Sequence, residues 1–567
     1  SLSANWMWPC KNEGEDARLY KAVKAVSDFS IALGINVPTG KDSLSMKQKY
    51  PNEEVISPGT VVISAAAHCN NITKVVEPML QKNGLNKIYY INFSNDDYKL
   101  GGSSFAQTQN KIGSDTPTIK SASKFKQAFN TIQQLIKEGR ILAGHDISSG
   151  GLLTTLLEMC FAQEMVGLQL DISKLGEKDA VKVLFAENSG IVFQSADAEL
   201  PKILKKNNVV FYELGNAVRS DKVSITNFEN NFEFNIAELR DVWFETSYLL
   251  DKKQCSNNKA QERFENYKNQ PLKYTFPKHF TGKLNDVIAN PVKQSVSNEE
   301  IATSQTSCNN ENIISSAVEK PKAAVIREKG SNSEREMANA MHLAGFDVKD
   351  VHMTDLISGR ETLEDIQFIG AVGGFSNSDV LGSAKGWAGA FLYNEKAKKA
   401  LDNFFKRDDT LSVGICNGCQ LFMELEIINP EHKVHGKLIH NDSNKHESNF
   451  TSVTIQENNS VMLSSLAGST LGVWISHGEG KFNLPLEEQH YNIVAKYGYD
   501  AYPSNPNGSD YNVAMMSSKD GRHLVMMPHI ERSIFQWNWA HYPANRTDEV
   551  SPWVEAFVNA KKWLENK

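Results

Sequence analysis

The chain has 567 residues, which is too long for one hydrophobic core and favours three or four domains. With 40% hydrophobic and 22% charged residues, the chain has a globular composition. Its net charge of −7 argues against nucleic acid as the main partner. No apolar run approaches the length of a membrane span. Seven widely scattered cysteines do not form a disulfide framework, so we expect a cytoplasmic protein. Because the chain opens at Ser1 without a signal peptide, we interpret it as processed or as a fragment of a longer protein.

The first 80 residues are predicted to form a small α/β domain. Apolar residues at helical spacing indicate a helix over residues 15–33, and residues 60–67 have the composition of a strand. Between them, the run Pro-Thr-Gly-Lys-Asp-Ser at 38–43 is predicted to be a loop. Its Lys41, Asp42 and Ser43 lack the spacing of a phosphate-binding P-loop, so a solvated turn is the simpler interpretation.

Residues 81–250 are predicted to form a second α/β domain. The expected strands are 87–93, 190–194 and 209–214, and the expected helices are 122–138, 152–161 and 235–250. Directly before one of these helices, the stretch ILAGHDISSGGL at 141–152 offers a carboxylate at Asp146, a hydroxyl at Ser148 and free backbone N–H groups. These groups could hold a phosphate or a metal bound to a phosphate, although a turn that only caps the helix explains them equally well.

Residues 251–320 are polar and rich in Ser and Asn, and we interpret them as a long linker that is partly ordered against its neighbours. Residues 321–567 alternate strands with helices, which predicts a mostly parallel, doubly wound sheet. The expected strands are 322–327, 347–352, 368–372, 411–415, 452–456, 472–475, 491–496 and 524–527, and the expected helices are 333–344, 384–406 and 553–565. Sites in such sheets form at the carboxyl ends of the strands, where the Gly-Gly after 368–372, Cys416 and His529 all fall.

Cys416 follows the strand 411–415 directly and precedes an apolar run that could form a helix. A nucleophile between a strand and a helix sits on a sharp turn that exposes its side chain, and the helix N-terminus stabilises a thiolate. An isolated cysteine is more often an inert core residue, but Gly414 and Gly418 would relieve crowding on both sides of this turn. Although Cys416 and Cys419 form a C-x-x-C pair, no second pair at zinc spacing accompanies them.

A nucleophilic thiolate needs a base, and the base needs a group that orients it. His529 and Glu531 follow a strand end at a two-residue spacing that can place both side chains on one side of the chain. The backbone N–H groups of Gly374 and Asn417 are the natural oxyanion donors. Cys416, His529, Glu531, Gly374 and Asn417 therefore predict nucleophilic attack on a carbonyl carbon.

These residues carry a family resemblance. The run GICNGCQ resembles the G-x-C-x-G-x-Q signature of class I glutamine amidotransferases, and His529-x-Glu531 is similar to their second signature. Other stretches resemble the large multidomain phosphoribosylformylglycinamidine synthases of purine biosynthesis, in family order and from end to end outside the linker. They include SLSANWMW, GEDARLYKAVKAV, PTGKDSLSMK, LAGHDISSGGL, IREKGSNSEREMANAM, GGFSNSDVLGSAKGWA and HGEGKF.

The resemblance implies a reaction and a domain plan. Glutamine would be hydrolysed at Cys416 through a thioester, and the ammonia would reach a synthase site where ATP activates formylglycinamide ribonucleotide. The chain would comprise most of a second α+β half that resembles aminoimidazole ribonucleotide synthetase, followed by the amidotransferase domain. The half with the catalytic ATP site would be missing, and the full-length protein would be a monomer.

The family's second half also holds an auxiliary nucleotide (ATP or ADP) with Mg²⁺. The resemblance assigns Asp146 as a metal ligand and Ser148 as a nucleotide ligand, while the other ligands would precede Ser1, so this site would be incomplete. Where HDRSDGGL is frequent in the family, Ile147 and Ser149 stand here, and Asn377 and Ser378 depart from the frequent GGFSYGD. His477 in the HGEG stretch could line the glutamine pocket or could be an ordinary histidine at a turn.

Two alternatives stay open from the sequence alone. The chain could be another cysteine hydrolase of the same fold, using Cys416 and His529 on a different amide or ester. It could also be a nucleotide-holding scaffold without activity of its own.

Overall fold

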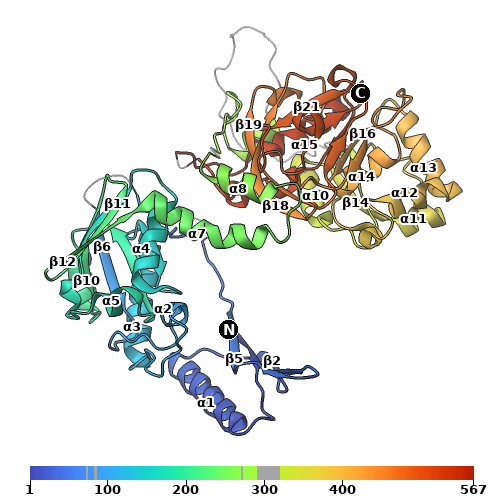
Figure 1. The fold of residues 1–567 in the computed structure, drawn as a ribbon. Helices are drawn as coiled ribbons and strands as arrows, with labels where there is room; N and C mark the ends of the chain where they lie inside the picture. The colour runs from blue at the N-terminus through green and yellow to red at the C-terminus, as the bar shows by residue number, and fades with distance from the viewer. Residues whose placement is uncertain (72–73, 82–85, 270–271, 290–319, 544) are drawn as a thin grey trace, which may run out of the picture. The chain divides into compact units, whose positions relative to one another are not determined.

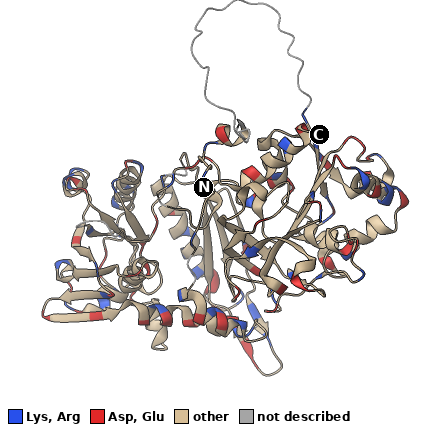
Figure 2. Ribbon diagram, turned by 90° about the horizontal axis from the view of Figure 1, so that it is seen from above, with Lys and Arg blue, Asp and Glu red and all other residues tan. Residues whose placement is uncertain are grey.

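The computed structural model describes residues 1–71, 74–81, 86–269, 272–289, 320–543 and 545–567 (Figure 1). They form two compact units, Ser1–Phe244 and Glu245–Lys567. Basic and acidic residues are interspersed along both units (Figure 2). None of the helices within the described ranges is long and apolar enough to cross a bilayer.

The first unit begins with a three-stranded sheet in the order β2-β1-β5, accompanied by the long helix α1. A small hairpin, β3–β4, lies between β2 and β5 in the sequence. The elements are β1 (Leu2–Met7), α1 (Glu15–Leu33), β2 (Thr39–Ser43), β3 (Lys47–Lys49), β4 (Glu54–Ile56) and β5 (Thr60–Ala65). The predicted loop at 38–43 is wrong for its last five residues, because β2 pairs in parallel with β1, a tertiary contact that its polar sequence does not reveal.

The rest of this unit is a seven-stranded, mostly antiparallel sheet in the order β12-β11-β8-β10-β6-β9-β7. Its strands are β6 (Lys87–Asn92), β7 (Ala143–Asp146), β8 (Gly167–Asp171), β9 (Gly190–Ser195), β10 (Tyr212–Val218), β11 (Lys222–Asn227) and β12 (Asn230–Asn235). The helices are α2 (Ser104–Thr108), α3 (Ala122–Lys137), α4 (Gly151–Phe161), α5 (Ala180–Phe185), α6 (Leu200–Lys206) and α7 (Ile236–Asp251), of which α7 runs on into the second unit. Leu152, Leu156 and Cys160 of α4 are fully buried at one-turn spacing, which anchors this helix in the core.

The second unit is built on a nine-stranded sheet in the order β14-β13-β15-β16-β23-β22-β21-β18-β19. Its larger elements are β13 (Lys322–Arg327), α10 (Glu334–Ala344), β14 (Asp347–His352), α11 (Met353–Ser358), β15 (Phe368–Ala371), α12 (Lys385–Leu392), α13 (Glu395–Lys406), β16 (Leu411–Ile415), α14 (Asn417–Glu424), β18 (Glu447–Ile455), β19 (Thr470–His477), β21 (Asn492–Tyr497), β22 (Val513–Ser517), β23 (His523–Met526) and α15 (Trp553–Glu565). The short strands β17 (Lys437–Ile439) and β20 (Lys481–Asn483) form a separate pair. The expected doubly wound plan is confirmed for the first five strands, which are parallel, whereas the other four continue the sheet antiparallel.

The strand order explains why a site forms in this unit. Strand β13 lies between β14 and β15, so the chain changes direction across the sheet at β13, and crossover helices fall on different faces. Helix α10 packs against α15, while α11, α12 and α13 pack on one another (Figure 1). All residues of β15 and β16 are buried, as expected of strands covered on both faces.

The structure divides the predicted helix 384–406 into α12 and α13. The side chain of Asn394 accepts a hydrogen bond from the Ala397 N–H at 3.0 Å and starts a new helix. Within α13 the buried positions Ala397, Ala400, Leu401 and Phe404 follow the helical repeat. The spacing of apolar residues thus continues from α12 into α13, although the Asn394 cap separates the two helices.

The segment expected to be a linker contains ordered structure where it is described. Helix α8 (Lys259–Asn266) and helix α9 (Leu284–Ala289) lie there, and Thr275 forms an isolated bridge with Thr470. Arg263 of α8 pairs with the buried carboxylate of Glu447 at 2.6 Å. Residues 290–319 of the expected linker lie outside the described residues.

Candidate active site

Cys416 lies at the sharp turn between β16 and α14, as the sequence predicted. Its backbone has φ 52° and ψ −106°, a conformation that side-chain-bearing residues rarely adopt. A β-carbon on Gly414 would lie 2.6 Å from the Gly418 carbonyl oxygen, and one on Gly418 would lie 2.1 Å from that of Ala371. The two glycines therefore permit the close backbone approach that this turn requires.

His529 and Glu531 form a buried hydrogen-bonded pair just beyond β23. His529 Nδ1 lies 2.6 Å from Glu531 Oε1, and the His529 N–H donates to the Trp474 carbonyl at 2.8 Å. Desolvation lowers the pKa of His529, but the Glu531 carboxylate and Cys416 raise it more, to about 10. His529 Nε2 is buried and has no hydrogen-bond partner among the described residues, so this nitrogen is available for chemistry.

Gly373 shows how closely the nucleophile and the histidine approach. A β-carbon at this position would lie 2.8 Å from His529 Cε1 and 3.3 Å from Cys416 Cβ. The carboxyl ends of β15, β16 and β23 thus bring Gly373, Cys416 and His529 together. Only glycine leaves room for the Cys416 and His529 side chains at this point.

The two residues expected to donate to an oxyanion follow β15 and β16. Asn417 is the first residue of α14, so its N–H has no acceptor within the helix. Gly374 has φ 125° and lies against Ser331, and its N–H makes no hydrogen bond to a described residue. The Asn417 side chain accepts from the Ser376 N–H at 3.2 Å, which ties the loop after Gly374 to the nucleophile turn.

The turn after β19 closes another side of the site. The Ser476 carbonyl oxygen lies 3.5 Å from Cys416 Sγ, and the Glu479 carbonyl accepts from Gln420 Nε2 at 2.6 Å. His477, which the sequence left open as a pocket or turn residue, is buried between them. Desolvation and the nearby His529 and His446 lower the pKa of His477 to about 3.

Two acidic residues add negative charge beside the nucleophile turn. The Glu479 carboxylate accepts from the Ser383 N–H at 2.9 Å and from its hydroxyl. Burial and the charge of Glu479 raise the pKa of Asp379, which accepts a hydrogen bond from the Asn417 amide. This side of the site suits a cationic group of a ligand.

Cys419 lies one helical turn beyond Cys416 and is completely enclosed. Burial raises the pKa of its thiol well above the usual value, which disfavours the thiolate. The geometry therefore separates the two cysteines, with Cys416 as the candidate nucleophile and Cys419 as a packing residue.

The expected nucleotide and metal residues belong to the first unit. Asp146 ends β7 with an exposed carboxylate near His145, and Ser148 is also exposed. The Gly150 N–H, one of the groups expected to bind phosphate, donates to Glu187 Oε1 at 2.9 Å, as does the Ser104 N–H at 2.8 Å. No three acidic, histidine or cysteine side chains gather as a metal site in the described ranges.

Sequence reasoning missed Gly373 and the contacts of the Ser476–Gly480 turn. Gly373 stood in the Gly-Gly pair, but only Gly374 was assigned a role. The turn belongs to the antiparallel half of the sheet, where no strand-end rule pointed to a site. The HGEG motif was the one available signal.

Comparisons with known proteins agree with this geometry. A family model described as a CobB/CobQ-like glutamine amidotransferase domain matches residues 320–564. A model described as an FGAR-AT PurM_N-like domain matches residues 1–68, and the C-terminal domain of AIR synthase related proteins matches residues 94–227. The amidotransferase match covers nearly all of the described strands and helices that build the Cys416 centre.

Relatives match along the whole chain. The Arabidopsis thaliana protein named "Probable phosphoribosylformylglycinamidine synthase, chloroplastic/mitochondrial" is 38% identical over 100% of this chain and 40% of its own length. The Homo sapiens phosphoribosylformylglycinamidine synthase is 37% identical over 99% of this chain and 42% of its own length. The chain thus spans about two-fifths of the length of these relatives. Among solved structures, PurLQS from Thermotoga maritima aligns with 43% of this chain and 99% of its own at 24% identity and a TM-score of 0.35.

Proposed function

We propose that the second unit of this chain hydrolyses glutamine at Cys416. The chain corresponds over its whole length to part of the phosphoribosylformylglycinamidine synthases. The observation that carries this proposal is the buried His529–Glu531 pair, whose free Nε2 lies beside a cysteine on a strained strand-to-helix turn. A match to a glutamine amidotransferase domain over the same residues supports glutamine as the substrate.

The first half of the reaction forms a thioester. The Cys416 thiolate attacks the side-chain carbonyl carbon of glutamine, and the N–H groups of Gly374 and Asn417 donate to the developing oxyanion. The His529 imidazolium, held by Glu531, gives its proton to the departing nitrogen, so ammonia leaves as the C–N bond breaks. Asp379 and Glu479 supply the negative charge that attracts the α-ammonium group of glutamine.

The second half releases glutamate. His529 is now neutral and accepts a proton from water as the oxygen of that water attacks the thioester carbon. The C–S bond breaks and Cys416 returns as a thiolate beside the imidazolium of His529. The pair thus returns to its starting protonation state after each turnover.

The wider assignment rests on the relatives. In the full-length protein we expect the ammonia to convert formylglycinamide ribonucleotide into the amidine with ATP, in the cytoplasm. ATP or ADP with Mg²⁺ near Asp146 and Ser148 stays a prediction, because further ligands would be needed there. The other candidate function, a cysteine hydrolase acting on a different amide or ester, uses the same three side chains, and its substrate would react in place of glutamine.

A comparison of glutamine with ammonia tests the proposal. In the full-length protein, Cys416→Ala should abolish glutamine-dependent amidine synthesis and leave ammonia-dependent synthesis intact. The chain studied here should make no amidine even with ammonia and ATP. Loss of the ammonia-dependent reaction in Cys416→Ala would show that Cys416 does not act on glutamine alone.

A further inference from the structure

The turn His477–Gly480 contacts the nucleophile region at both ends. The Ser476 carbonyl, directly before it, lies 3.5 Å from Cys416 Sγ, and the Glu479 carbonyl accepts from Gln420 on α14. A shift of this turn would therefore move one wall of the site and the support of the nucleophile helix together. The question is which groups hold the turn in place.

Asn441 holds it from one side with all the hydrogen bonds that an amide can make. Its Nδ2 donates to the His477 carbonyl at 2.8 Å and to the Lys445 carbonyl at 3.0 Å. Its Oδ1 accepts from the Gly480 N–H at 2.9 Å and lies 3.2 Å from His477 Nδ1. The side chain is only 2% exposed, so these bonds have no competition from bulk water.

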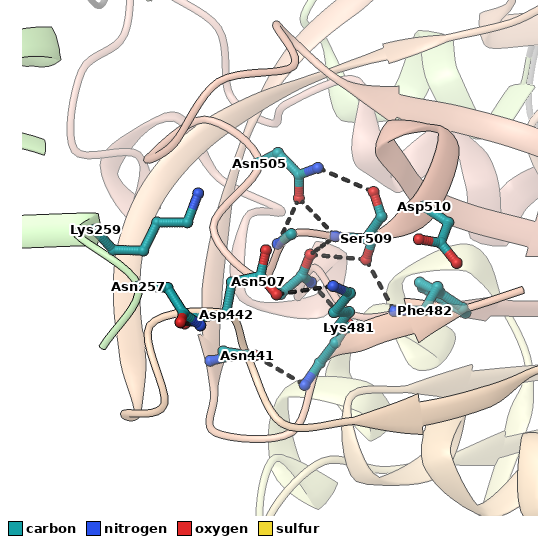
Figure 3. Close-up of polar contacts among 12 residues, drawn as sticks. Asn257, Lys259, Asn441, Asp442, Lys481, Phe482, Asn505, Asn507, Ser509 and Asp510 are labelled. Atoms are coloured by element: carbon teal, nitrogen blue, oxygen red, sulfur yellow. Dashed lines mark hydrogen bonds and ion pairs between the residues drawn. The ribbon is translucent and has the colours of Figure 1, made fainter. Parts of the chain in front are cut away.

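Asn507 contacts the same turn (Figure 3). Asn507 Nδ2 donates to the Gly480 carbonyl at 2.7 Å, and the backbone carbonyl of Asn507 accepts from the Asp442 N–H at 3.1 Å. The Asp442 carboxylate in turn pairs with Lys481 at 2.8 Å. Asn441 and Asn507, both buried, thus connect the turn to the two loops that carry them.

The same network fixes the proton of His477. Two carbonyl groups and one N–H group surround the Asn441 amide, so its nitrogen must face the carbonyls and its oxygen the N–H. Because that oxygen can only accept, His477 Nδ1 must carry the proton. In the neutral imidazole, Nε2 is then the unprotonated nitrogen, and it is buried without a hydrogen-bond partner among the described residues.

We propose that Asn441 is a positioning residue of the glutamine site, which holds the His477–Gly480 turn against Cys416 and Gln420 and fixes the tautomer of His477. This inference rests on the proposed function. The titratable groups facing His477 are His529 and His446, and the low pKa of His477 agrees with its neutral state. A neutral His477 leaves His529 as the one imidazolium of this pair.

The rates at which two reagents alkylate Cys416 separate the positioning of the glutamine site from the activation of the thiol. A diazo-ketone analogue of glutamine requires the bound geometry, whereas iodoacetamide requires only the activated thiol. The variants are Asn441→Ala, the isosteric Asn441→Asp, which cannot donate to the two carbonyls, and Asn257→Ala as a matched control. Asn257 is exposed, and its Nδ2 donates to the Asp442 carbonyl at 2.8 Å, on the loop that carries Asn441.

In both Asn441 variants we expect the second-order rate of modification of Cys416 by the diazo ketone to fall by about 10- to 100-fold, since small displacements have effects of this size. The iodoacetamide rate should stay within about threefold of wild type, and Asn257→Ala should match wild type with both reagents. Diazo-ketone rates near wild type, or a parallel fall with both reagents, would overturn the inference. A wild-type chain that reacts with iodoacetamide but not with the diazo ketone would contradict the proposed function, and this inference would fall with it.

Discussion

His529 Nδ1 lies 2.6 Å from Glu531 Oε1, and the two side chains are 2% and 0% exposed. Burial alone would lower the pKa of the imidazole, but the carboxylate holds the proton on it and, with Cys416, raises that pKa to about 10. At neutral pH the site therefore holds a proton ready for a leaving amine. This relationship ties the protonation of His529, beside Cys416, to a fully buried carboxylate.

Replacing Glu531 should shift the pH dependence of the reaction. The protonated form of His529 is present below its pKa, so wild-type glutamine hydrolysis should persist at pH 8–9 and decline as the pH approaches about 10. Glu531→Gln removes the charge that raises this pKa, so the decline should move to lower pH, toward about 6.5 or below. The exposed carboxylate of Glu549, paired with Lys283, offers a matched control as Glu549→Gln. Superimposable profiles for wild type and Glu531→Gln would refute this role of the carboxylate.

A methyl group at Gly373 should separate the nucleophile from its base. The added β-carbon would lie 2.8 Å from His529 Cε1 and 3.3 Å from Cys416 Cβ, so Gly373→Ala should lower glutaminase activity by about 100-fold or more. Gly389→Ala, in α12, meets only Tyr393 Cδ2 at 3.8 Å and should leave activity unchanged. Steady-state glutamate release from the two variants checks this, and equal activities would contradict the packing described around His529.

A buried histidine away from the site should make the second unit sensitive to acid. Desolvation and the charge of Arg522 lower the pKa of His523 to about 4, and Ser412 Oγ lies 3.0 Å from its Nδ1. Between pH 6.5 and 4, His523 is protonated in the unfolded chain but neutral in the folded chain. The free energy of unfolding therefore falls as the pH falls, by about 3 kcal/mol from this group. His523→Gln should show a shallower loss of thermal stability from pH 7 to 4.5, followed by circular dichroism. Since His477 titrates in the same direction, some acid sensitivity should persist.

Local patterns predicted two elements of the second unit with their bounds. The strand Leu411–Ile415 and the helix Trp553–Glu565 have the predicted bounds, because each has a strong apolar pattern closed by clear end signals. The predicted helix 384–406 failed at Asn394, where a cap interrupts a rhythm that is otherwise continuous. Strand β2 was missed because its pairing with β1 overrides a turn-like sequence.

The candidate site also has one part that the sequence predicted and one part that only the structure reveals. Cys416, His529, Glu531, Gly374 and Asn417 follow strand ends of the sheet, which is why the rule about strand ends pointed to them as candidates. The contribution of Ser476, His477 and Asn441 comes from the antiparallel strands, whose hydrogen-bond partners are distant in the sequence. The order β18–β19 at the far edge, and the curvature that pairs Trp474 with His529, could not be read from residue spacing.

Cys416, on its strained turn, is proposed as the nucleophile that attacks glutamine. Treatment of this chain with a diazo-ketone analogue of glutamine, followed by peptide mass spectrometry, tests it most directly. We expect one equivalent of label on Cys416, slower labelling of Cys416 when glutamine is present, and no label on the enclosed Cys419. Label on Cys419, or modification of Cys416 that glutamine does not slow, would contradict it.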